Sequence, residues 1–364
     1  MRACGKPRGL QFINWFIHFK IPKGLPFLLN EIMNYRESTL IFNAIKKSKN
    51  ILLNCHRGSD PDSIGSTLAL YKALQNMGKT SAIICPSHEL YESIKYLDDY
   101  KIIQRNVDFS YFDFSKFDLF ITLDSSSWDM VCGNSTTKRP NLKTVVIDHH
   151  VTNKRFGDIN LVDSDVTSTG ELLYKIFQDL EIKIDSQIAN YLMVAVVGDT
   201  GGFRFPNLSS YTFAMIADLI GRGADKDKII HHIYRSESFK LIKFFGKVLD
   251  SLVLEEKEKF VWAAIPYKTF KEFGKPATAR ESAASLFMQV VDGTDFGFLA
   301  IEETKGVLSV SFRSRSGFDT SKIALKLGGG GHIYASGAKI KGQPFAKAVD
   351  KLLRAVRNSL DGSV

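Results

Sequence analysis

The chain contains the stretch TVVIDHH at residues 144–150, and this stretch decides what kind of fold the rest can form. Four β-branched or apolar residues in succession are typical of a buried strand in a parallel sheet. The polarity then changes abruptly to one carboxylate, Asp148, and two imidazoles, His149 and His150. Ligands bind at the carboxyl ends of the strands in open α/β sheets. The stretch therefore predicts a functional site at this edge, although polar residues that are merely solvated would give the same letters.

Two other apolar runs, at residues 51–53 and 119–123, also read as strands that lead into polar side chains. Because the carboxyl ends of parallel strands meet at one edge of a sheet, we expect these side chains to converge there. Converging carboxylates and imidazoles can hold metal ions, whereas a solvated acidic loop would need no such arrangement. The side chains that follow the two strands are His56, Asp60, Asp62 and Asp124.

A fourth acidic position, Asp199, follows a helix expected at residues 188–197. This helix is apolar on almost every side, so it should be buried. It runs into the sequence GDTGG, in which glycines flank the acid and permit close approach of the backbone. An acid at the end of a buried helix indicates a functional position for Asp199, and a plain glycine-rich turn is the alternative.

The order of the elements indicates an α/β protein with two lobes. In the N-terminal lobe, strands alternate with helices, which predicts a parallel sheet with helices on both faces. The C-terminal lobe combines a hairpin with helices, which predicts a smaller α/β domain, and a charged helical stretch should join the two lobes. The expected strands are 51–53, 81–85, 119–123 and 144–147 in the first lobe and 260–265, 296–301 and 307–312 in the second, whose helices are expected at 281–291 and 320–327.

Four glycines at residues 328–331 precede His332. We expect them to pack against nothing and to present bare backbone amides to a ligand, with His332 beside them. A flexible loop is the alternative reading.

Length and composition fit a globular protein of two domains. The 364 residues are 44% hydrophobic and 24% charged. The formal net charge of +9 favours an anionic partner such as a nucleotide, a nucleic acid or a membrane surface, although dispersed lysines also fit a generally basic surface. The four cysteines show no C-x-x-C spacing, which favours a reducing, cytoplasmic setting.

The first 36 residues are the least readable part of the chain. Polar residues interrupt the run at 10–21 and no cleavage site follows, so the segment is a poor signal peptide and too polar to span a bilayer. We interpret residues 1–36 as an accessory extension or as the product of an early start codon, with Met33 as the later start. A peripheral membrane contact is a further alternative.

Together these features resemble the DHH phosphoesterase family, a RecJ-like superfamily, and in particular its short members with a C-terminal DHHA1 domain. The resemblance covers residues 37–360, and the fixed order of five motifs makes it specific. Nanoribonucleases and pAp phosphatases look most similar, with cyclic-dinucleotide phosphodiesterases as near relatives. The matching motifs are H-x-x-x-D-x-D-x-x-G-S from His56 to Ser66, Asp124, the DHH triplet at 148–150, GDTG with FR from Gly198 to Arg204, and GGGH from Gly329 to His332.

Two departures from the family pattern are visible. The family often has proline before the first aspartate of its first motif and glycine after it, whereas Ser59 precedes Asp60 and Pro61 follows it here. Because the ligand side chains are intact, we expect an altered loop backbone and retained metals. After the glycine run, ASG at 335–337 replaces the usual two alanines and glycine, which bears on substrate preference.

The resemblance implies two divalent metal ions with Asp124 as the bridging ligand. It implies that Asp148 orients the adjacent imidazole and that His150 interacts with the scissile phosphate or the leaving group. The first ion would be held by His56, Asp60 and Asp124, the second by Asp62, Asp124, His149 and Asp199, and the substrate by Arg313, Gly329, Gly330, Gly331 and His332.

The chemistry of these residues favours manganese. Four carboxylates at one strand edge would repel each other, and two divalent cations would cancel that charge. Oxygen-rich ligation with two imidazoles suits Mn²⁺ better than Zn²⁺, with Mg²⁺ and Co²⁺ left open. Paired ions activate water and stabilise the oxygens of an in-line displacement at phosphorus.

We therefore expect a manganese-dependent phosphoesterase that hydrolyses short oligoribonucleotides and small nucleotides such as pAp or pApA. A cyclic-dinucleotide phosphodiesterase is one alternative, and a non-catalytic RNA-binding module, suggested by the basic charge, is another. A homodimer is left open. The expected domains are an extension at 1–36, a DHH catalytic domain at 37–225, a helical linker at 226–245 and a DHHA1 substrate-binding domain at 246–364.

Overall fold

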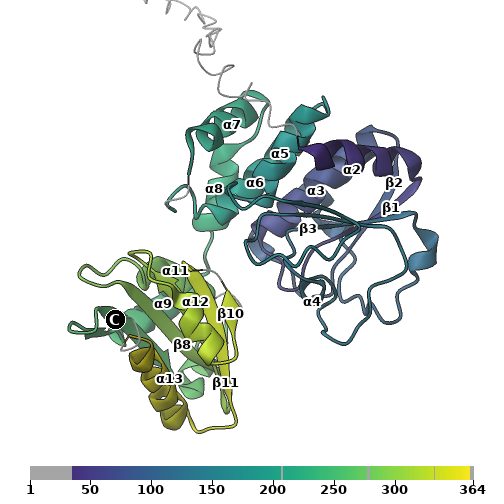
Figure 1. Cartoon of the computed structure of the whole chain (residues 1–364). Helices are drawn as coiled ribbons and strands as arrows, with labels where there is room; N and C mark the ends of the chain where they lie inside the picture. Colours follow the sequence, from purple (N-terminus) through teal and green to yellow (C-terminus); the bar gives the residue numbers. More distant parts are fainter. Residues whose placement is uncertain (1–34, 206–207, 277–278, 332, 361–364) are drawn as a thin grey trace, which may run out of the picture. The chain divides into compact units, whose positions relative to one another are not determined.

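A computed structural model of the chain divides it into two compact units (Figure 1). The first unit ends at Ser236 and the second begins at Glu237, between helices α8 and α9. The extension expected at the N-terminus lies outside the described residues, apart from its last two positions. Within the described part of the chain, no helix is both long enough and apolar enough to cross a bilayer. The described residues are 35–205, 208–276, 279–331 and 333–360.

The first unit is built on a sheet of five parallel strands in the order β2-β1-β3-β4-β5. The four strands expected from the sequence are present, which confirms the parallel α/β architecture of this lobe. A fifth strand pairs with β4 and was not expected, because four residues carry too little pattern to be recognised. The strands are β1 (Asn50–Asn54), β2 (Thr80–Ile84), β3 (Leu119–Leu123), β4 (Thr144–Asp148) and β5 (Ile159–Val162).

The strands are continuously apolar because the sheet is covered on both faces. Along β1, Ile51 and Leu53 belong to the core beneath the long helices, whereas Leu52 belongs to the core on the opposite face. The short helix α4 and the aromatic segment 107–117 cover that opposite face. The helices of this unit are α2 (Arg36–Lys47), α3 (Pro61–Asn76), α4 (Trp128–Cys132), α5 (Thr169–Asp179), α6 (Ser186–Asp199), α7 (Ser210–Gly221) and α8 (Lys226–Tyr234), with 3₁₀ turns η1 (Glu92–Ile94), η2 (Asp98–Ile102) and η3 (Phe114–Lys116).

Residues 61–66 form the first turns of α3. Asp60 is the N-cap of this helix, because its Oδ1 accepts a hydrogen bond from the backbone N–H of Ser63 at 2.9 Å. Pro61 occupies the first helical position, where its fixed φ angle suits a helix start. The acidic side chains at the start of α3 are therefore held by a helix and not by a loop.

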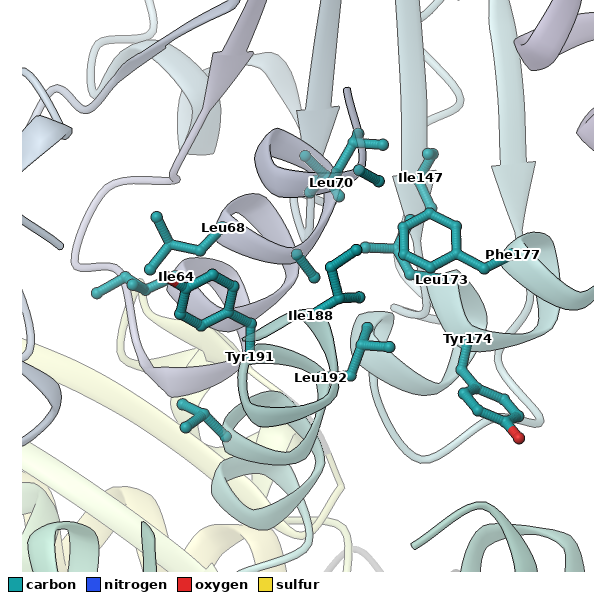
Figure 2. Close-up of a cluster of buried hydrophobic side chains, with 14 of the residues drawn as sticks. Ile64, Leu68, Leu70, Ile147, Leu173, Tyr174, Phe177, Ile188, Tyr191 and Leu192 are labelled. Carbon is teal, nitrogen blue, oxygen red and sulfur yellow. The ribbon is translucent and has the colours of Figure 1, made fainter. Parts of the chain in front are cut away.

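Helices α3 and α6 cross closely because glycines lie at their contact. A Cβ atom on Gly65 would lie 2.6 Å from the carbonyl oxygen of Tyr191, and one on Gly198 would lie 2.6 Å from the Cβ of Pro61. The close crossing brings the last turn of α6, with Asp199, to the start of α3. The buried side chains around this contact include Ile64, Leu68, Ile188, Tyr191 and Leu192 (Figure 2).

The second unit is built on a mixed sheet of six strands in the order β10-β11-β9-β8-β7-β6. Strands β7 and β8 are parallel, and the other neighbours are antiparallel. This arrangement confirms the expected second α/β domain. Its strands are β6 (Val253–Glu255), β7 (Phe260–Ile265), β8 (Phe296–Thr304), β9 (Val307–Ser314), β10 (Gly330–Gly331) and β11 (Ala335–Lys341), and its helices are α9 (Phe239–Asp250), α10 (Tyr267–Glu272), α11 (Ala279–Phe287), α12 (Thr320–Lys326) and α13 (Phe345–Leu360).

Gly329 and Gly331 have a packing role, so the expectation that the glycine run packs against nothing was wrong for these two positions. A Cβ atom on Gly329 would lie 2.7 Å from the Cα of Ala338, and one on Gly331 would lie 2.6 Å from the carbonyl oxygen of Ala335. Both contacts are with β11, the strand that pairs with β10. Side chains at these two positions would push the two strands apart.

Gly65→Ala should lower the free energy of unfolding of the first unit by about 1–3 kcal/mol, because the added methyl group must separate α3 from α6. Gly246→Ala is the matched control. Gly246 also lies inside a helix, α9, but nothing lies within 4 Å of its Cβ position, so alanine should be neutral or stabilise by about 0.5–1 kcal/mol. Urea unfolding without added metal measures the free energy of unfolding of both variants. Equal unfolding midpoints for Gly65→Ala and Gly246→Ala would contradict the packing argument.

Candidate metal centre

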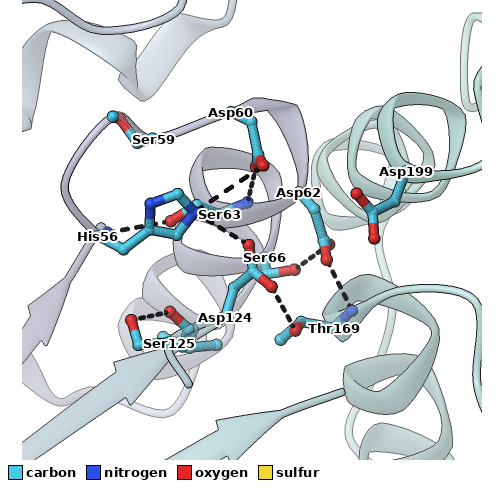
Figure 3. Close-up of polar contacts among 12 residues, drawn as sticks. His56, Ser59, Asp60, Asp62, Ser63, Ser66, Asp124, Ser125, Thr169 and Asp199 are labelled. Atoms are coloured by element: carbon cyan, nitrogen blue, oxygen red, sulfur yellow. Dashed lines mark hydrogen bonds and ion pairs between the residues drawn. The ribbon is translucent and has the colours of Figure 1, made fainter. Parts of the chain in front are cut away.

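Side chains from separate parts of the sequence meet at the carboxyl edge of the parallel sheet. His56 follows β1, Asp124 follows β3 and His149 follows β4. Two helices contribute at their ends, with Asp62 in the first turn of α3 and Asp199 at the last residue of α6. All six residues expected as metal ligands come together here, in three overlapping groups whose ligand atoms lie within 4.8 Å of one another; Figure 3 shows five of them.

The first group consists of His56, Asp60 and Asp124. His56 Nε2 lies 3.3 Å from Asp124 Oδ2 and 3.9 Å from Asp60 Oδ2. The other ring nitrogen, Nδ1, lies 2.9 Å from the carbonyl oxygen of Arg57, to which it can donate a hydrogen bond. This bond fixes the ring so that Nε2 faces the carboxylates.

The second group consists of Asp62, His149 and Asp199. His149 Nε2 lies 3.0 Å from Asp199 Oδ2 and 3.8 Å from Asp62 Oδ2. It also lies 3.6 Å from Oδ1 of Asp124, a residue of the first group. The two carboxylate oxygens of Asp124 therefore face different groups, Oδ2 the first and Oδ1 the second.

The backbone of Asp124 is in the left-handed region, with a φ of 55°. This conformation costs a residue other than glycine about 1–3 kcal/mol unless its surroundings hold it, and aspartate tolerates it better than most residues. It occurs at the point where β3 ends and the side chain must turn toward both groups.

Asp148 is fully buried next to His150. It belongs to neither the first nor the second ligand group. Asp148 Oδ1 lies 2.7 Å from His150 Nδ1, and Oδ2 accepts a hydrogen bond from Asn153 Nδ2 at 2.6 Å. His150 Nδ1 also lies 3.6 Å from Asp124 Oδ1. Asn153 escaped the sequence analysis, because an isolated asparagine beyond the DHH triplet follows no recognisable pattern.

The Asp62 carboxylate lies at the N-terminus of α5. Its Oδ2 accepts from the backbone N–H of Thr169 at 2.8 Å, and its Oδ1 accepts from the backbone N–H of Gly170 and the hydroxyl of Ser66, both at 3.0 Å (Figure 3). Free N–H groups and the helix dipole stabilise a negative charge there. Sequence reasoning missed this contact because it joins residues that lie 107 positions apart.

Crowding of carboxylates controls the protonation of the metal-free site. Burial and the charges of neighbouring aspartates, Asp124 first, raise the pKa of Asp62 well above its usual value. Partial burial and the Asp124 charge also raise the pKa of Asp60, to about 6. Burial opposes ionisation of Asp124 as well, but its hydrogen bond with His56 and the nearby imidazoles outweigh it and lower its pKa.

The imidazoles of the site have raised pKa values because carboxylates surround them. Burial lowers the pKa of His56, but its hydrogen bond with Asp124 and the charges of Asp60 and Asp124 outweigh burial and raise the pKa to about 10. The pKa of His149 also rises well above its usual value, because Asp199 and the other carboxylates outweigh burial. Imidazolium ions thus balance part of the carboxylate charge in the metal-free protein.

The donor set fits divalent cations. Four carboxylates and two imidazoles offer mainly oxygen ligands, as Mn²⁺ and Mg²⁺ prefer, and two such ions would balance the four negative charges. The cluster is therefore a candidate site for divalent metal ions.

The residues expected to bind substrate lie in the second unit. Arg313 is on β9, where its Nε donates to Ser285 Oγ at 3.0 Å and its Nη1 donates to the carbonyl oxygen of Phe312 at 2.9 Å. Burial lowers the pKa of Arg313 to about 10. Gly329, Gly330 and Gly331 lie at β10 beside β11, and His332 lies outside the described residues.

Comparison with known proteins agrees with this geometry. The model of the DHH family N-terminal domain matches residues 50–196, and that of the DHHA1 domain matches residues 265–361. The chain is 28% identical over 313 residues to the bifunctional oligoribonuclease and PAP phosphatase NrnA of Thermus thermophilus, covering 85% of this chain and 90% of that protein. It is 24% identical to the cyclic-di-AMP phosphodiesterase GdpP of Bacillus subtilis, covering 88% of this chain but 49% of GdpP.

A solved structure shares the fold. An exopolyphosphatase-related protein from Bacteroides fragilis superposes with a TM-score of 0.82 at 22% identity, covering 89% of this chain and 96% of that one.

Metal binding should release protons and become tighter as the pH rises. At pH 7 the metal-free imidazoles of His56 and His149 carry protons that a metal ion must displace, since their pKa values are raised. Affinity for Mn²⁺ should therefore increase about tenfold per pH unit for each displaced proton between pH 6 and 8. Calorimetric titration in two buffers of different ionisation enthalpy counts these protons. Heats that are independent of both buffer and pH would contradict the assignment.

Proposed function

The chain is a DHH-family phosphoesterase with a C-terminal DHHA1 domain, and we propose that it hydrolyses short oligoribonucleotides and small nucleotides such as pAp or pApA with Mn²⁺ as its metal. The observation that carries the proposal is that Asp124 faces His56 with one carboxylate oxygen and His149 with the other. The similarity to NrnA along almost the whole of both proteins favours this substrate class.

The ligand groups divide naturally between two ions. His56, Asp60 and Asp124 would hold one, and Asp124 would join the second group to hold the other. When bound, such a pair lowers the pKa of water and stabilises charge on the oxygens of an in-line displacement at phosphorus. The exposed fractions of the Asp60 and Asp199 side chains, 45% and 29%, leave the site open to a substrate.

The proposed chemistry also needs residues that do not hold metal but orient or bind the substrate. Asp148 fixes the ring of His150 through Nδ1, and this bond helps to raise the pKa of His150 against the effect of burial. A protonated His150 can bind the scissile phosphate or give a proton to the leaving oxygen. Arg313, the glycine run and His332 would bind the far phosphate and the nucleotide from the DHHA1 domain.

Manganese is proposed because of the ligand types. Zinc sites commonly have four ligands and favour thiolate or imidazole, whereas this set is dominated by carboxylates. Two imidazoles among those carboxylates favour Mn²⁺ over Mg²⁺, which prefers oxygen ligands and keeps several waters.

A cyclic-dinucleotide phosphodiesterase is the second candidate, favoured by the similarity to GdpP. The chain spans only about half of GdpP, so the similarity does not extend to the other half of that protein. A non-catalytic RNA-binding module is disfavoured, because four converging carboxylates would repel an RNA backbone.

A panel of substrates tests the proposal directly. The purified protein should hydrolyse di- to pentaribonucleotides, pAp and pApA with Mn²⁺, and should be slower on cyclic dinucleotides. Each substrate is assayed with Mn²⁺, Mg²⁺ and Co²⁺ in parallel. Protein that leaves the three linear substrates intact with all three ions would exclude the proposed function, and faster turnover of a cyclic dinucleotide would favour the second candidate.

Variants locate the site. Asp124→Ala, and separately the double change His149→Ala with His150→Ala, should each lower kcat at least about a thousandfold while the chain stays folded. The first removes the ligand that both ions would share, and the second removes a ligand of one ion together with the imidazole proposed to act on the phosphate. The matched control for the double change replaces another adjacent pair, His231 and His232 on α8, with alanine. That control should retain wild-type turnover, and an active Asp124→Ala variant would show that the site is wrong.

A further inference from the structure

Thr169, the first residue of α5, contacts carboxylates that serve different parts of the candidate metal centre. Its backbone N–H donates to Asp62 Oδ2 at 2.8 Å, and its side-chain hydroxyl donates to Asp124 Oδ1 at 3.1 Å. The residue is fully buried. Figure 3 shows Thr169 beside both carboxylates, on the side away from His56.

We propose that Thr169 is a positioning residue that sets how the Asp124 carboxylate is shared between the two metal ions. The inference rests on the proposed function only in requiring that the site binds two metal ions. Neither sequence motifs nor the ligand groups include Thr169, and its role is to act through Asp124.

The two oxygens of the Asp124 carboxylate face different imidazoles. Its Oδ2 faces His56 Nε2 at 3.3 Å, and its Oδ1 faces His149 Nε2 at 3.6 Å. The Thr169 hydroxyl bonds only to Oδ1, the oxygen on the His149 side. A fixed donor on one oxygen prevents the carboxylate from rotating, so each oxygen keeps its own metal group.

The same threonine helps to select the ligand oxygen of Asp62. Two donors, from Ser66 and Gly170, already occupy Oδ1 of Asp62. Oδ2 accepts one bond, from Thr169, and it is the oxygen that lies 3.8 Å from His149 Nε2. Asp62 should therefore bind metal through Oδ2 alone.

The start of α5 is itself held by contacts that do not touch the metal ligands. The hydroxyls of Thr167 and Thr212 donate to Glu171 Oε2 at 2.6 Å and 3.0 Å, and Ser168 caps the helix. Thr212 is fully buried, as Thr169 is. Thr212→Val therefore removes an equivalent hydroxyl-to-carboxylate bond in the same region while leaving the metal ligands untouched.

The test compares Thr169→Val, Thr169→Ser and Thr212→Val in the full-length protein. Valine keeps the shape and the backbone N–H of Thr169 but removes the hydroxyl. Thr169→Val should bind Mn²⁺ about ten- to a hundredfold more weakly, measured by calorimetry without substrate, and should lose the electron paramagnetic resonance signal of spin-coupled Mn²⁺ pairs. Thr169→Ser should restore the Mn²⁺ affinity and the signal of the coupled pair. Thr212→Val should resemble the wild type in these two properties.

Thermal unfolding without metal verifies that each variant is folded. The proposal would be overturned if Thr169→Val bound Mn²⁺ as the wild type does, or if Thr212→Val lost as much affinity, since the effect would then be general destabilisation of α5. Failure of the serine variant to restore binding would also overturn it. Because binding is measured without nucleotides, a wild-type protein that binds two Mn²⁺ ions but cleaves no substrate would contradict the proposed function and leave this inference standing.

Discussion

Mutual repulsion among four carboxylates at one edge of a sheet is the constraint on which this structure depends. The carboxylates approach within reach of common ligand positions, and some are almost fully buried, where like charges interact strongly. The protein places donors against each of them. Asp62 receives backbone N–H groups of α5, Asp60 receives the N–H of Ser63, Asp124 faces an imidazole on either side, and Asp199 faces His149.

Close packing of two helices beside the acids makes this arrangement possible. His56, Asp124 and His149 lie at the same edge because each follows the carboxyl end of a parallel strand. The carboxylate at the end of α6 is different, because a helix end can lie there only if α6 closely approaches α3. The contacts of Gly65 and Gly198 permit that approach, so residues with no side chain contribute as much to the site as some ligands do.

Much of the fold and most of the candidate ligands could be predicted from the sequence, because both follow from local patterns. Apolar runs mark β1 to β4, and the polar residues after them lie where parallel strands must end. Contacts between distant segments leave no such pattern. The bond between Thr169 and Asp124, the role of Asn153 and the packing of the 328–331 glycines against β11 depend on tertiary neighbours, so the sequence could not reveal them.

The candidate metal ligands and the residues proposed to bind substrate lie on different units. All six candidate ligands belong to the first unit, whereas Arg313 and the glycine run belong to the second. The half-buried Arg313 guanidinium donates to Ser285 and to the carbonyl oxygen of Phe312. Burial lowers the pKa of Arg313 although the charge of Glu281 opposes this effect, so a further counter-charge would favour the charged form. A substrate phosphate would do so, which makes Arg313 sensitive to where the phosphates of a nucleotide lie while the metal groups stay unchanged.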